Sequence, residues 1–245
     1  MEITTDLITM AIMQITLIIL TCFGSYLLGS IPFTVWIGKL ATGKDLRAFH
    51  SGNPGGFNAV RTYGFNLGIL LLFLDQLKGC LTIGIVDHLF SLPFFSAADG
   101  FNYYHTIVCI LAPAFCILGQ IYPIWLKFDG GQGMGAYMGA LMYVNPLLLL
   151  IFFLFHTIFY VGCKLSTRTA GTIAIILTIF PPFFIPIAPP WNNLLLDWTI
   201  GSNNFIHLTQ GLIVMAMVLV LLIRRLQNAL IGTHIKQETF LKEDR

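Results

Sequence analysis

Residues 43–64, GKDLRAFHSGNPGGFNAVRTYG, are the longest polar, glycine-rich interruption of a chain that is otherwise almost continuously apolar. Between two hydrophobic segments this stretch gathers Lys44, Asp45, Arg47, His50, Ser51, Asn53, Asn58 and Arg61. Its glycines Gly52, Gly55 and Gly56 allow backbone N–H groups to point into one concavity, and the arginines add permanent positive charge. The stretch therefore predicts an anion site, with phosphate as the first ligand to consider.

An ordinary cytoplasmic loop is the alternative interpretation, because basic loops beside hydrophobic spans commonly serve only to orient a membrane protein. Orientation requires lysine and arginine, but it does not require small hydroxyl and amide side chains alternating with glycine. The run SGNPGGFN, residues 51–58, has that alternation. It favours a functional loop.

The composition places the chain in a membrane. Of its 245 residues, 56% are hydrophobic and 10% are charged, and the mean hydropathy is +0.81. Soluble domains carry about 25% charged residues. A helix needs about 20 apolar residues to cross a bilayer, and such runs lie at about 8–29, 65–90, 104–126, 147–163, 169–188 and 207–223. We expect an all-α polytopic protein that forms a single membrane-embedded domain over residues 1–245.

The basic residues predict the orientation. Outside the spans they fall at 39–61, 127, 164–168 and 224–245, and none falls at 91–103 or 189–206. The positive-inside rule places the first group in the cytoplasm and the second outside, with the N-terminus outside and the C-terminus cytoplasmic. Because Glu2 and Asp6 lead the first run in place of basic residues, we expect a first span and not a signal peptide.

Two short helices complete the expected topology. Lys127 and Lys164 share a side, so the segment between them crosses the membrane an even number of times. Two helices that turn at Asn145-Pro146 satisfy this requirement and give seven transmembrane helices. The first, at about 133–144, would be roughly 18 Å long, shorter than the ~30 Å hydrocarbon layer. Short or broken helices are tolerated where they line a polar cavity, and Pro32 predicts a second break at 29–32.

Asp75 and Lys78 stand inside the second hydrophobic segment, and their spacing places them on one face of a helix. A charge near the bilayer centre costs about 2.5 to 3.5 kcal/mol on insertion scales, so two charges need a reason. One interpretation is a structural ion pair within the helix bundle. The other is that Lys78 contacts an anionic substrate and Asp75 orients it.

A second glycine-rich stretch, residues 119–135, leads directly into the short helix. Gly130, Gly131, Gly133 and Gly135 precede or begin that helix, whose free N–H groups and positive dipole end would face the loop. This arrangement predicts a second anion site. The alternative is that these glycines serve only close helix packing.

The remaining polar features have structural interpretations. The hydroxyls and Arg168 of residues 164–172 fit a helix cap with topological charge, and Arg224, Arg225 and Asn228 fit a basic stop after the last span. We expect packed or interfacial side chains for His88, His105, His156 and His207, which have no carboxylate at useful spacing, and for Cys22, Cys80, Cys109, Cys116 and Cys163. No metal, no cofactor and no nucleic-acid partner is implied.

Four motifs carry a resemblance: GSIPFTVWIGK at 29–39, DLRAFHSGNPGGFNAVRTYG at 45–64, LDQLKG at 74–79 and GQIYPIWLKFDGGQG at 119–133. Their order and positions resemble those of the PlsY-type bacterial glycerol-3-phosphate acyltransferases, which transfer an acyl chain from acyl phosphate to glycerol 3-phosphate. The resemblance implies a multi-pass protein of the bacterial inner (plasma) membrane, a site that faces the cytoplasm, those two substrates, and a role in phospholipid biosynthesis.

The resemblance also implies roles for individual residues. Ser51 corresponds to the family's essential loop serine and Arg61 to its essential arginine, and we expect Asn53 to help position and polarise the substrate. The expected substrate-binding residues are Arg47, Asn58, Lys78, Gly130, Gly131, Gln132, Gly133, Arg225 and Asn228.

This chain departs from the family pattern at four positions. Gln120 and Arg225 stand where the family has histidine, Gln132 stands where it has lysine, and Phe57 replaces a small hydroxyl residue. One expectation is an active enzyme in which the leaving phosphate accepts the proton. The alternative is a catalytically impaired paralogue that binds a lipid phosphate headgroup or regulates an active acyltransferase. A transporter is a third class, disfavoured by the lack of an internal repeat.

Overall fold

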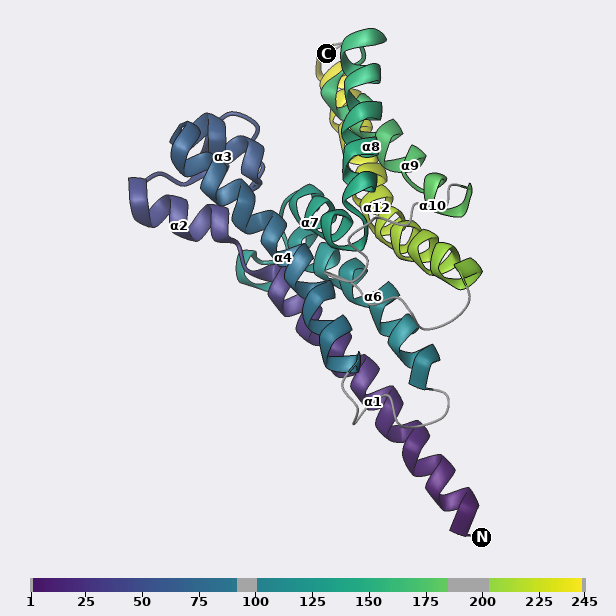
Figure 1. Cartoon of the computed structure of the whole chain (residues 1–245). Coiled ribbons are helices and arrows are strands. Elements are labelled where there is room, and N and C mark those ends of the chain that lie inside the picture. The colour runs from purple at the N-terminus through teal and green to yellow at the C-terminus, as the bar shows by residue number, and fades with distance from the viewer. Residues whose placement is uncertain (1, 92–100, 185–202, 244–245) are drawn as a thin grey trace.

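The computed structural model describes residues 2–91, 101–184 and 203–243, and no strand occurs among them (Figure 1). The helices are α1 (Glu2–Ser30), α2 (Phe33–Thr42), α3 (Gly56–Tyr63), α4 (Phe65–Ser91), α6 (Phe101–Ile121), α7 (Met134–Val144), α8 (Pro146–Thr157), α9 (Thr167–Leu177), α10 (Pro181–Phe184) and α12 (Asn203–Glu243). Short 3₁₀ turns lie at Leu46–Ala48 and Ile124–Leu126, and a π-helical turn at Ile158–Gly162 continues α8.

Within the described residues, each of the seven expected apolar segments is mainly helical, and residues 185–188 of the sixth lie outside that part of the chain. Among the described residues, five stretches are long and apolar enough to cross a membrane, and Met134–Val144 and Pro146–Gly162 are shorter apolar helices. The all-α polytopic class is therefore confirmed. Seven crossings and the sides of the two termini stay predictions.

Both expected irregularities are confirmed. The chain breaks between α1 and α2 at Ile31-Pro32, and α7 gives way to α8 at Asn145-Pro146. Asn145 caps α8 because its side-chain oxygen accepts a hydrogen bond from the Leu147 N–H across 3.0 Å. Pro146 occupies the first helical position, where no N–H is needed.

The long helices carry apolar side chains on their outer faces. Ile8, Ile12, Ile15 and Ile19 of α1 are 55 to 62% exposed. Exposed apolar surface on this scale marks contact with a partner or with lipid. Because α1 is a candidate span, we assign this face to the lipid.

Helices α4 and α7 pack closely because glycines face each other's backbone. A Cβ at Gly79 would lie 1.9 Å from the Ala136 carbonyl oxygen, and a Cβ at Gly139 would lie 1.7 Å from that of Gln76. Such contacts bring membrane helices within van der Waals reach of each other's backbone. The short helix α7 is therefore held against α4, with its N-terminal end beside Asp75.

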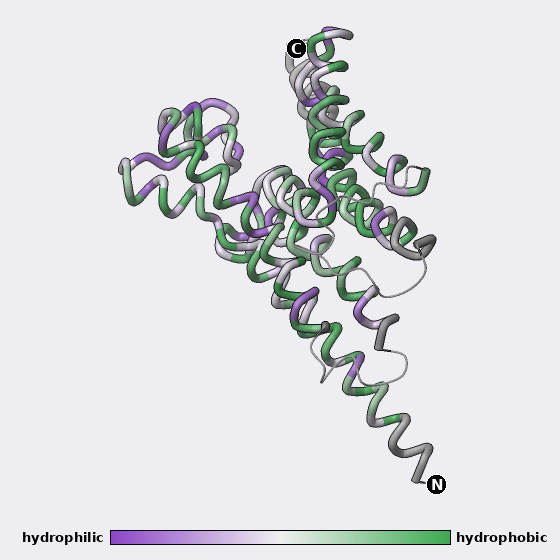
Figure 2. Tube along the Cα trace, viewed as in Figure 1, coloured by the Kyte–Doolittle hydropathy of each residue, from purple (hydrophilic) through white to green (hydrophobic). Residues whose placement is uncertain are grey.

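The polar stretch at 43–64 is more ordered than a loop. Its second half forms α3, and Figure 2 shows hydrophilic residues gathered in the arm that α2 and α3 build. The Tyr63 hydroxyl donates to the Lys44 carbonyl and accepts from the Leu46 N–H. Leu46 and Ala59 are completely buried beneath the arm. The sequence indicated the polarity of this stretch but not its small core.

Candidate active site

Two adjoining cavities lie between the α2–α3 arm and the group formed by α8, α9 and α12, with α7 contributing to both. The larger cavity has a volume of about 400 Å³ and the smaller about 120 Å³. Both are lined by Asn53, Phe57, Gln132, Met134, Met138 and Arg225. Figure 1 shows the two groups of helices on either side of α7. Residues far apart in the sequence thus meet at one site.

The larger cavity is basic on one part of its wall and apolar on another. Arg61, Arg168 and Arg225 line it, and no aspartate or glutamate does so among the described residues. Ser51 and Asn53 add a hydroxyl and an amide. Its apolar lining includes Met134, Met138, Phe152 and Phe153. This combination suits an anion that carries a long apolar chain.

Two helix N-termini line the smaller cavity. Gly55, Gly56 and Phe57 come from the start of α3, and residues 132–135 come from the start of α7. Within the described part of the chain, the N–H groups of 132–135 have no hydrogen-bond partner. Gly133 has a φ of +75°, a conformation that glycine adopts without strain. Two positive dipole ends around one small cavity make a phosphate-binding arrangement.

The glycine loop differs in detail from the expectation. The Gly130 N–H donates to the Ile121 carbonyl across 3.1 Å, and the Gly131 N–H donates to the Gln120 carbonyl across 3.0 Å. Both amides are therefore occupied within the loop itself, while Gly131 still lines the smaller cavity, so substrate binding by Gly130 and Gly131 stays a prediction. Their hydrogen bonds fold the loop so that Gln132 and Gly133 reach the cavity.

Gln120, at a position where the resemblance implies histidine, is 8% exposed and lines the smaller cavity. Its Oε1 accepts a hydrogen bond from the Ala136 N–H across 2.9 Å. The side chain therefore satisfies one of the first amides of α7 and leaves the amides before it free. We interpret Gln120 as a cap that shapes the cavity.

Helix α12 brings three polar residues to the site. Arg224 Nη2 donates to the Gly130 carbonyl across 3.3 Å and lies 3.6 Å from an Asp129 carboxylate oxygen. Arg225 reaches both cavities, and its Nη1 donates to the Arg168 carbonyl across 3.3 Å. Asn228 donates to the Gln132 side chain. These residues are more than a basic stop, because each one holds or lines the site.

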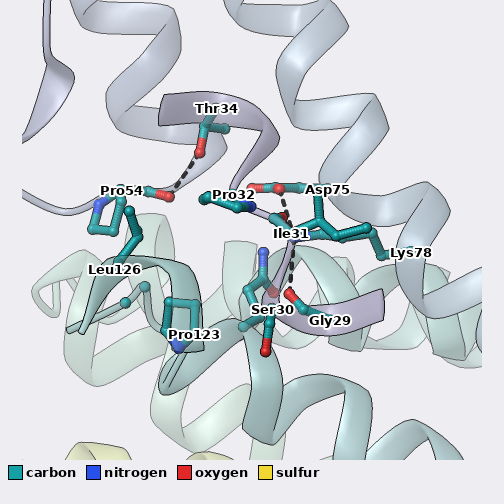
Figure 3. A pocket seen from close by; sticks show the side chains of 13 residues that line it. Gly29, Ser30, Ile31, Pro32, Thr34, Pro54, Asp75, Lys78, Pro123 and Leu126 are labelled. Carbon is teal, nitrogen blue, oxygen red and sulfur yellow. Dashed lines mark hydrogen bonds and ion pairs between the residues drawn. The ribbon is translucent and has the colours of Figure 1, made fainter. Parts of the chain in front are cut away.

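Asp75 and Lys78 form a buried ion pair, with both side chains 2% exposed and 3.1 Å between Nζ and Oδ1. Lys78 also donates to the carbonyls of Gly29, at 3.3 Å, and Ile31, at 2.9 Å, at the end of α1 (Figure 3). Asp75 lines the smaller cavity, whereas Lys78 lines, with Asp75, Gln120 and Gly131, a third and narrow pocket of about 10 Å³ (Figure 3). The contacts of Lys78 favour the structural interpretation, in which it satisfies the last carbonyls of the broken helix.

Arg47 and Asn58 lie away from both cavities, although they were expected to bind substrate. Arg47 donates two side-chain hydrogen bonds to the Asp45 carboxylate, from Nε to Oδ1 across 3.0 Å and from Nη2 to Oδ2 across 2.7 Å. Its hydrogen bonds hold the pKa of the Asp45 carboxyl at about 2. Asn58 is buried and donates to the carbonyls of Leu46 and Phe49. Both residues therefore stabilise the arm that presents Ser51 and Arg61.

One expectation about the histidines is wrong, and another is incomplete. His105 does have a carboxylate partner, since its Nε2 lies 2.9 Å from Oδ1 of Asp87 on the neighbouring helix. His156 is packed as expected, stacked on the Tyr160 ring and beside the Phe152 ring, and it also lines the larger cavity. A Cβ at Gly171 would lie 3.7 Å from His156 Cδ2 and 3.8 Å from Arg225 Nη2. The side chains of His156 and Arg225 therefore both lie next to Gly171 of α9. Neither relationship follows from sequence spacing.

The fold and the site together define a class: polytopic helical membrane proteins with a phosphate-type site beside an apolar wall. A family model described as glycerol-3-phosphate acyltransferase matches residues 19–231. The chain belongs to the glycerol-3-phosphate acyltransferase family.

Curated relatives carry the same description. The chain is 34% identical over 206 residues to a glycerol-3-phosphate acyltransferase of Enterococcus faecalis, covering 79% of this chain and 84% of the relative. It is 31% identical over 242 residues to one from Ureaplasma urealyticum, covering 95% and 94%.

Solved structures of an integral membrane glycerol 3-phosphate acyltransferase, PlsY (YgiH), are also similar. The glycerol 3-phosphate form matches with a TM-score of 0.53 and 26% identity, covering 86% of this chain and 92% of that chain. The lysophosphatidic acid form matches with a TM-score of 0.52 and 25% identity over the same shares. The shared fold therefore extends over most of both chains.

Proposed function

We propose that this protein transfers a fatty acyl group from acyl phosphate to the primary hydroxyl of glycerol 3-phosphate. The product is 1-acyl-glycerol 3-phosphate, an intermediate of phospholipid biosynthesis. One observation carries the proposal: a single site gathers Ser51, Arg61, Arg225 and the free amides of α7 beside an apolar wall. Family membership and the names of the relatives support it, and nothing in the comparisons supports the impaired-paralogue alternative.

The reaction requires little covalent help from the protein. The glycerol hydroxyl oxygen attacks the carbonyl carbon, a new ester bond forms, and the bond from that carbon to the phosphate oxygen breaks. The phosphate leaves with the bonding electron pair, and the hydroxyl loses its proton. Because acyl phosphate is already an activated anhydride, the protein mainly neutralises two phosphates and holds the hydroxyl near the carbonyl.

The two cavities divide these tasks. We assign one phosphate to the smaller cavity, where the N-termini of α3 and α7 provide amides and positive dipole ends. Arg61, Arg168 and Arg225 would neutralise the second phosphate in the larger cavity, because a guanidinium binds phosphate oxygens in pairs. The acyl chain would follow the apolar wall. Ser51 and Asn53 would position and polarise the reacting groups.

Two groups can accept the proton of the attacking hydroxyl. One is the leaving phosphate itself, in a substrate-assisted step. The other is His156, whose imidazole lines the same cavity as Ser51 and Arg225. With Arg225 in the position of the family's histidine, we propose His156 as the protein group that takes this role.

We also propose that residues 1–245 act as a single membrane-embedded domain and that the site faces the cytoplasm of a bacterial plasma membrane. The integral, multi-pass character supports the first point. The excess of lysine and arginine at 39–61 and 224–245 supports the second, because positive charge accumulates on the cytoplasmic side.

The deciding experiment is an acyl-transfer assay with the purified full chain, an acyl phosphate and glycerol 3-phosphate. We expect release of inorganic phosphate matched by formation of 1-acyl-glycerol 3-phosphate, and loss of both with Ser51→Ala. An inert wild-type chain that still copurifies with phospholipid would overturn the enzyme proposal in favour of headgroup binding.

A further inference from the structure

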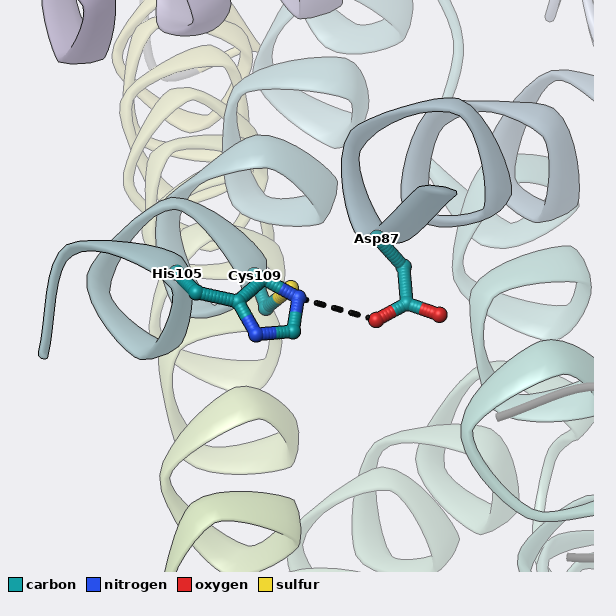
Figure 4. Close-up of side chains that lie close together, drawn as sticks. All are labelled: Asp87, His105 and Cys109. Carbon is teal, nitrogen blue, oxygen red and sulfur yellow. Dashed lines mark hydrogen bonds and ion pairs between the residues drawn. The ribbon is translucent and has the colours of Figure 1, made fainter. Parts of the chain in front are cut away.

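Three potential metal ligands meet at the far end of α4 from the substrate cavities. Asp87 of α4 and His105 and Cys109 of α6 place their ligand atoms within 4.8 Å of one another (Figure 4). Asp87 lies twelve residues beyond Asp75, which corresponds to about 18 Å along the helix. The cluster is therefore separate from the proposed acyltransferase site, and nothing in that reaction uses it.

The arrangement of the three side chains fits a tetrahedral ion. His105 and Cys109 are four residues apart on one helix, so they share a face and can bind one ion together. Asp87 approaches from the neighbouring helix, with its Oδ1 2.9 Å from His105 Nε2. Zinc bonds of about 2.0 to 2.3 Å place tetrahedral ligand atoms roughly 3.3 to 3.6 Å apart. Shifts on the order of 1 Å bring the cluster to that geometry.

A supporting residue orients the carboxylate. The Tyr143 hydroxyl donates to the other oxygen of Asp87, Oδ2, across 3.2 Å. Metal-binding carboxylates are usually held by such an outer hydrogen bond, and its loss typically lowers metal affinity 10- to 100-fold. Oδ1 is thereby directed toward His105 and Cys109. Asp87 and His105 have side chains 16% and 13% exposed and Cys109 is completely buried, so an ion would enter from the side of Asp87 and His105.

We propose that Asp87, His105 and Cys109 bind one zinc ion, with water as the fourth ligand. Thiolate and imidazole ligands favour zinc over magnesium or calcium, and one carboxylate completes a known ligand combination. A thiolate and a carboxylate together neutralise Zn²⁺, which suits a site that lies mostly out of water. On binding, the Cys109 proton is released to solvent, and neutral His105 keeps its remaining proton on Nδ1.

The ion would pin the end of α4 to the start of α6. These segments adjoin residues 92–100, which lie outside the described part of the chain. The ligands come from two different long helices and lie together only in the folded chain. Zinc would therefore bind the folded state in preference to the unfolded state and stabilise it by mass action. This role predicts an effect of zinc on stability that is independent of acyl transfer.

The test uses the purified full chain in detergent after treatment with EDTA. Titration with Co²⁺ reports the site, because thiolate coordination produces an intense charge-transfer band. We expect one equivalent of Co²⁺ to give this band, Zn²⁺ to displace it, and one equivalent of Zn²⁺ to raise the melting temperature. Cys109→Ser should abolish the band and the thermal shift, whereas the matched control Cys163→Ser, which changes an exposed cysteine, should retain both.

Two further variants keep the proposal falsifiable if Cys109→Ser folds poorly. Asp87→Asn keeps hydrogen-bonding capacity but removes the charge, and Tyr143→Phe removes only the outer hydrogen bond. We expect at least tenfold weaker Co²⁺ binding for each. The proposal would be overturned if the wild type bound Co²⁺ without the thiolate charge-transfer band. It would also be overturned if the Co²⁺ spectrum and the Zn²⁺-induced rise in melting temperature were the same in the wild type, Cys109→Ser and Asp87→Asn.

Discussion

Asn228 Nδ2 donates a hydrogen bond to Gln132 Oε1 across 3.2 Å, and this contact joins the last long helix to the loop that starts α7. Gln132 lines both cavities and stands at a position where the motif resemblance implies lysine. In this chain a neutral amide pair therefore occupies the place of a cation. The total positive charge at the site comes from Arg61, Arg168 and Arg225 instead.

Restoring the lysine should strengthen substrate binding. A charge-assisted hydrogen bond to phosphate is roughly twice as strong as a neutral one. We expect Gln132→Lys to lower the KM for glycerol 3-phosphate about five- to tenfold, despite the loss of the acceptor for Asn228. Steady-state kinetics measures the change. The control Gln132→Glu should raise the KM, and equal KM values in all three proteins would remove this position from the phosphate site.

The two arginines of the α2–α3 arm should differ sharply in importance. Arg61 lines the larger cavity, whereas Arg47 is paired with Asp45 outside both cavities. We expect Arg61→Ala to lower kcat/KM at least 100-fold, because a charged phosphate contact is lost at about 3 kcal/mol. Arg47→Ala should change it less than about threefold, as expected for an exposed ion pair. Equal losses of kcat/KM in the two variants would show that both arginines act by stabilising the arm, and that Arg61 does not contact substrate in the cavity.

His156→Gln tests the proposed proton acceptor. General-base help is worth about 10² to 10⁴ in rate, so kcat should fall by that factor while the KM for glycerol 3-phosphate changes much less. The pH profile of kcat separates this role from a structural one. The matched control is His88→Gln, which lies in α4 outside the lining of both cavities and should leave kcat and its pH profile unchanged.

A relocated histidine provides a second test of the same role. His156 and Arg225 flank Gly171, so Arg225→His places an imidazole close to the original one. We expect Arg225→His to recover part of the kcat lost in His156→Gln. If His156→Gln instead keeps the wild-type kcat and pH profile, the leaving phosphate accepts the proton.

Lys78→Met should destabilise the protein more than it alters substrate binding. The variant leaves Asp75 as an unpaired buried charge and removes the donors to Gly29 and Ile31, which typically costs about 3 to 5 kcal/mol in the free energy of unfolding. The midpoint of thermal unfolding in detergent measures the loss. Asp75→Asn combined with Lys78→Met should recover part of it. A normal midpoint with a greatly raised KM would return Lys78 to the substrate site.

Orientation can be tested by labelling in a cysteine-free background. A membrane-impermeant maleimide added to intact cells should modify Asp99→Cys and leave Lys44→Cys unmodified, because the basic loop is expected inside. Asp99 lies outside the described residues, and Lys44 lies in the arm beside the site. The reverse pattern would place the cavities on the outer side, away from a cytoplasmic substrate.

The sequence alone was sufficient for the class, the helical segments and the family. Hydrophobic runs report membrane helices directly, since each span must satisfy its own backbone hydrogen bonds in lipid. Proline and glycine marked the breaks at Pro32 and Pro146 for an equally local reason. Motif order then indicated the family that the comparisons confirm. These conclusions depend on neighbouring residues, so they required no knowledge of long-range packing.

Only the tertiary structure decided which polar residues share a site. His156 and Arg168 joined Ser51 and Arg61 because α8 packs against α7 and α9 packs against α8, and Asp87 met His105 because α4 packs against α6. Conversely, Lys78 and Asn58 matched motif positions, yet backbone carbonyls occupy their donors, from the end of α1 for Lys78 and from residues 46 and 49 for Asn58. Local spacing determines which face of a helix a side chain occupies. Packing between helices determines what that face meets, and this is not contained in any single stretch of sequence.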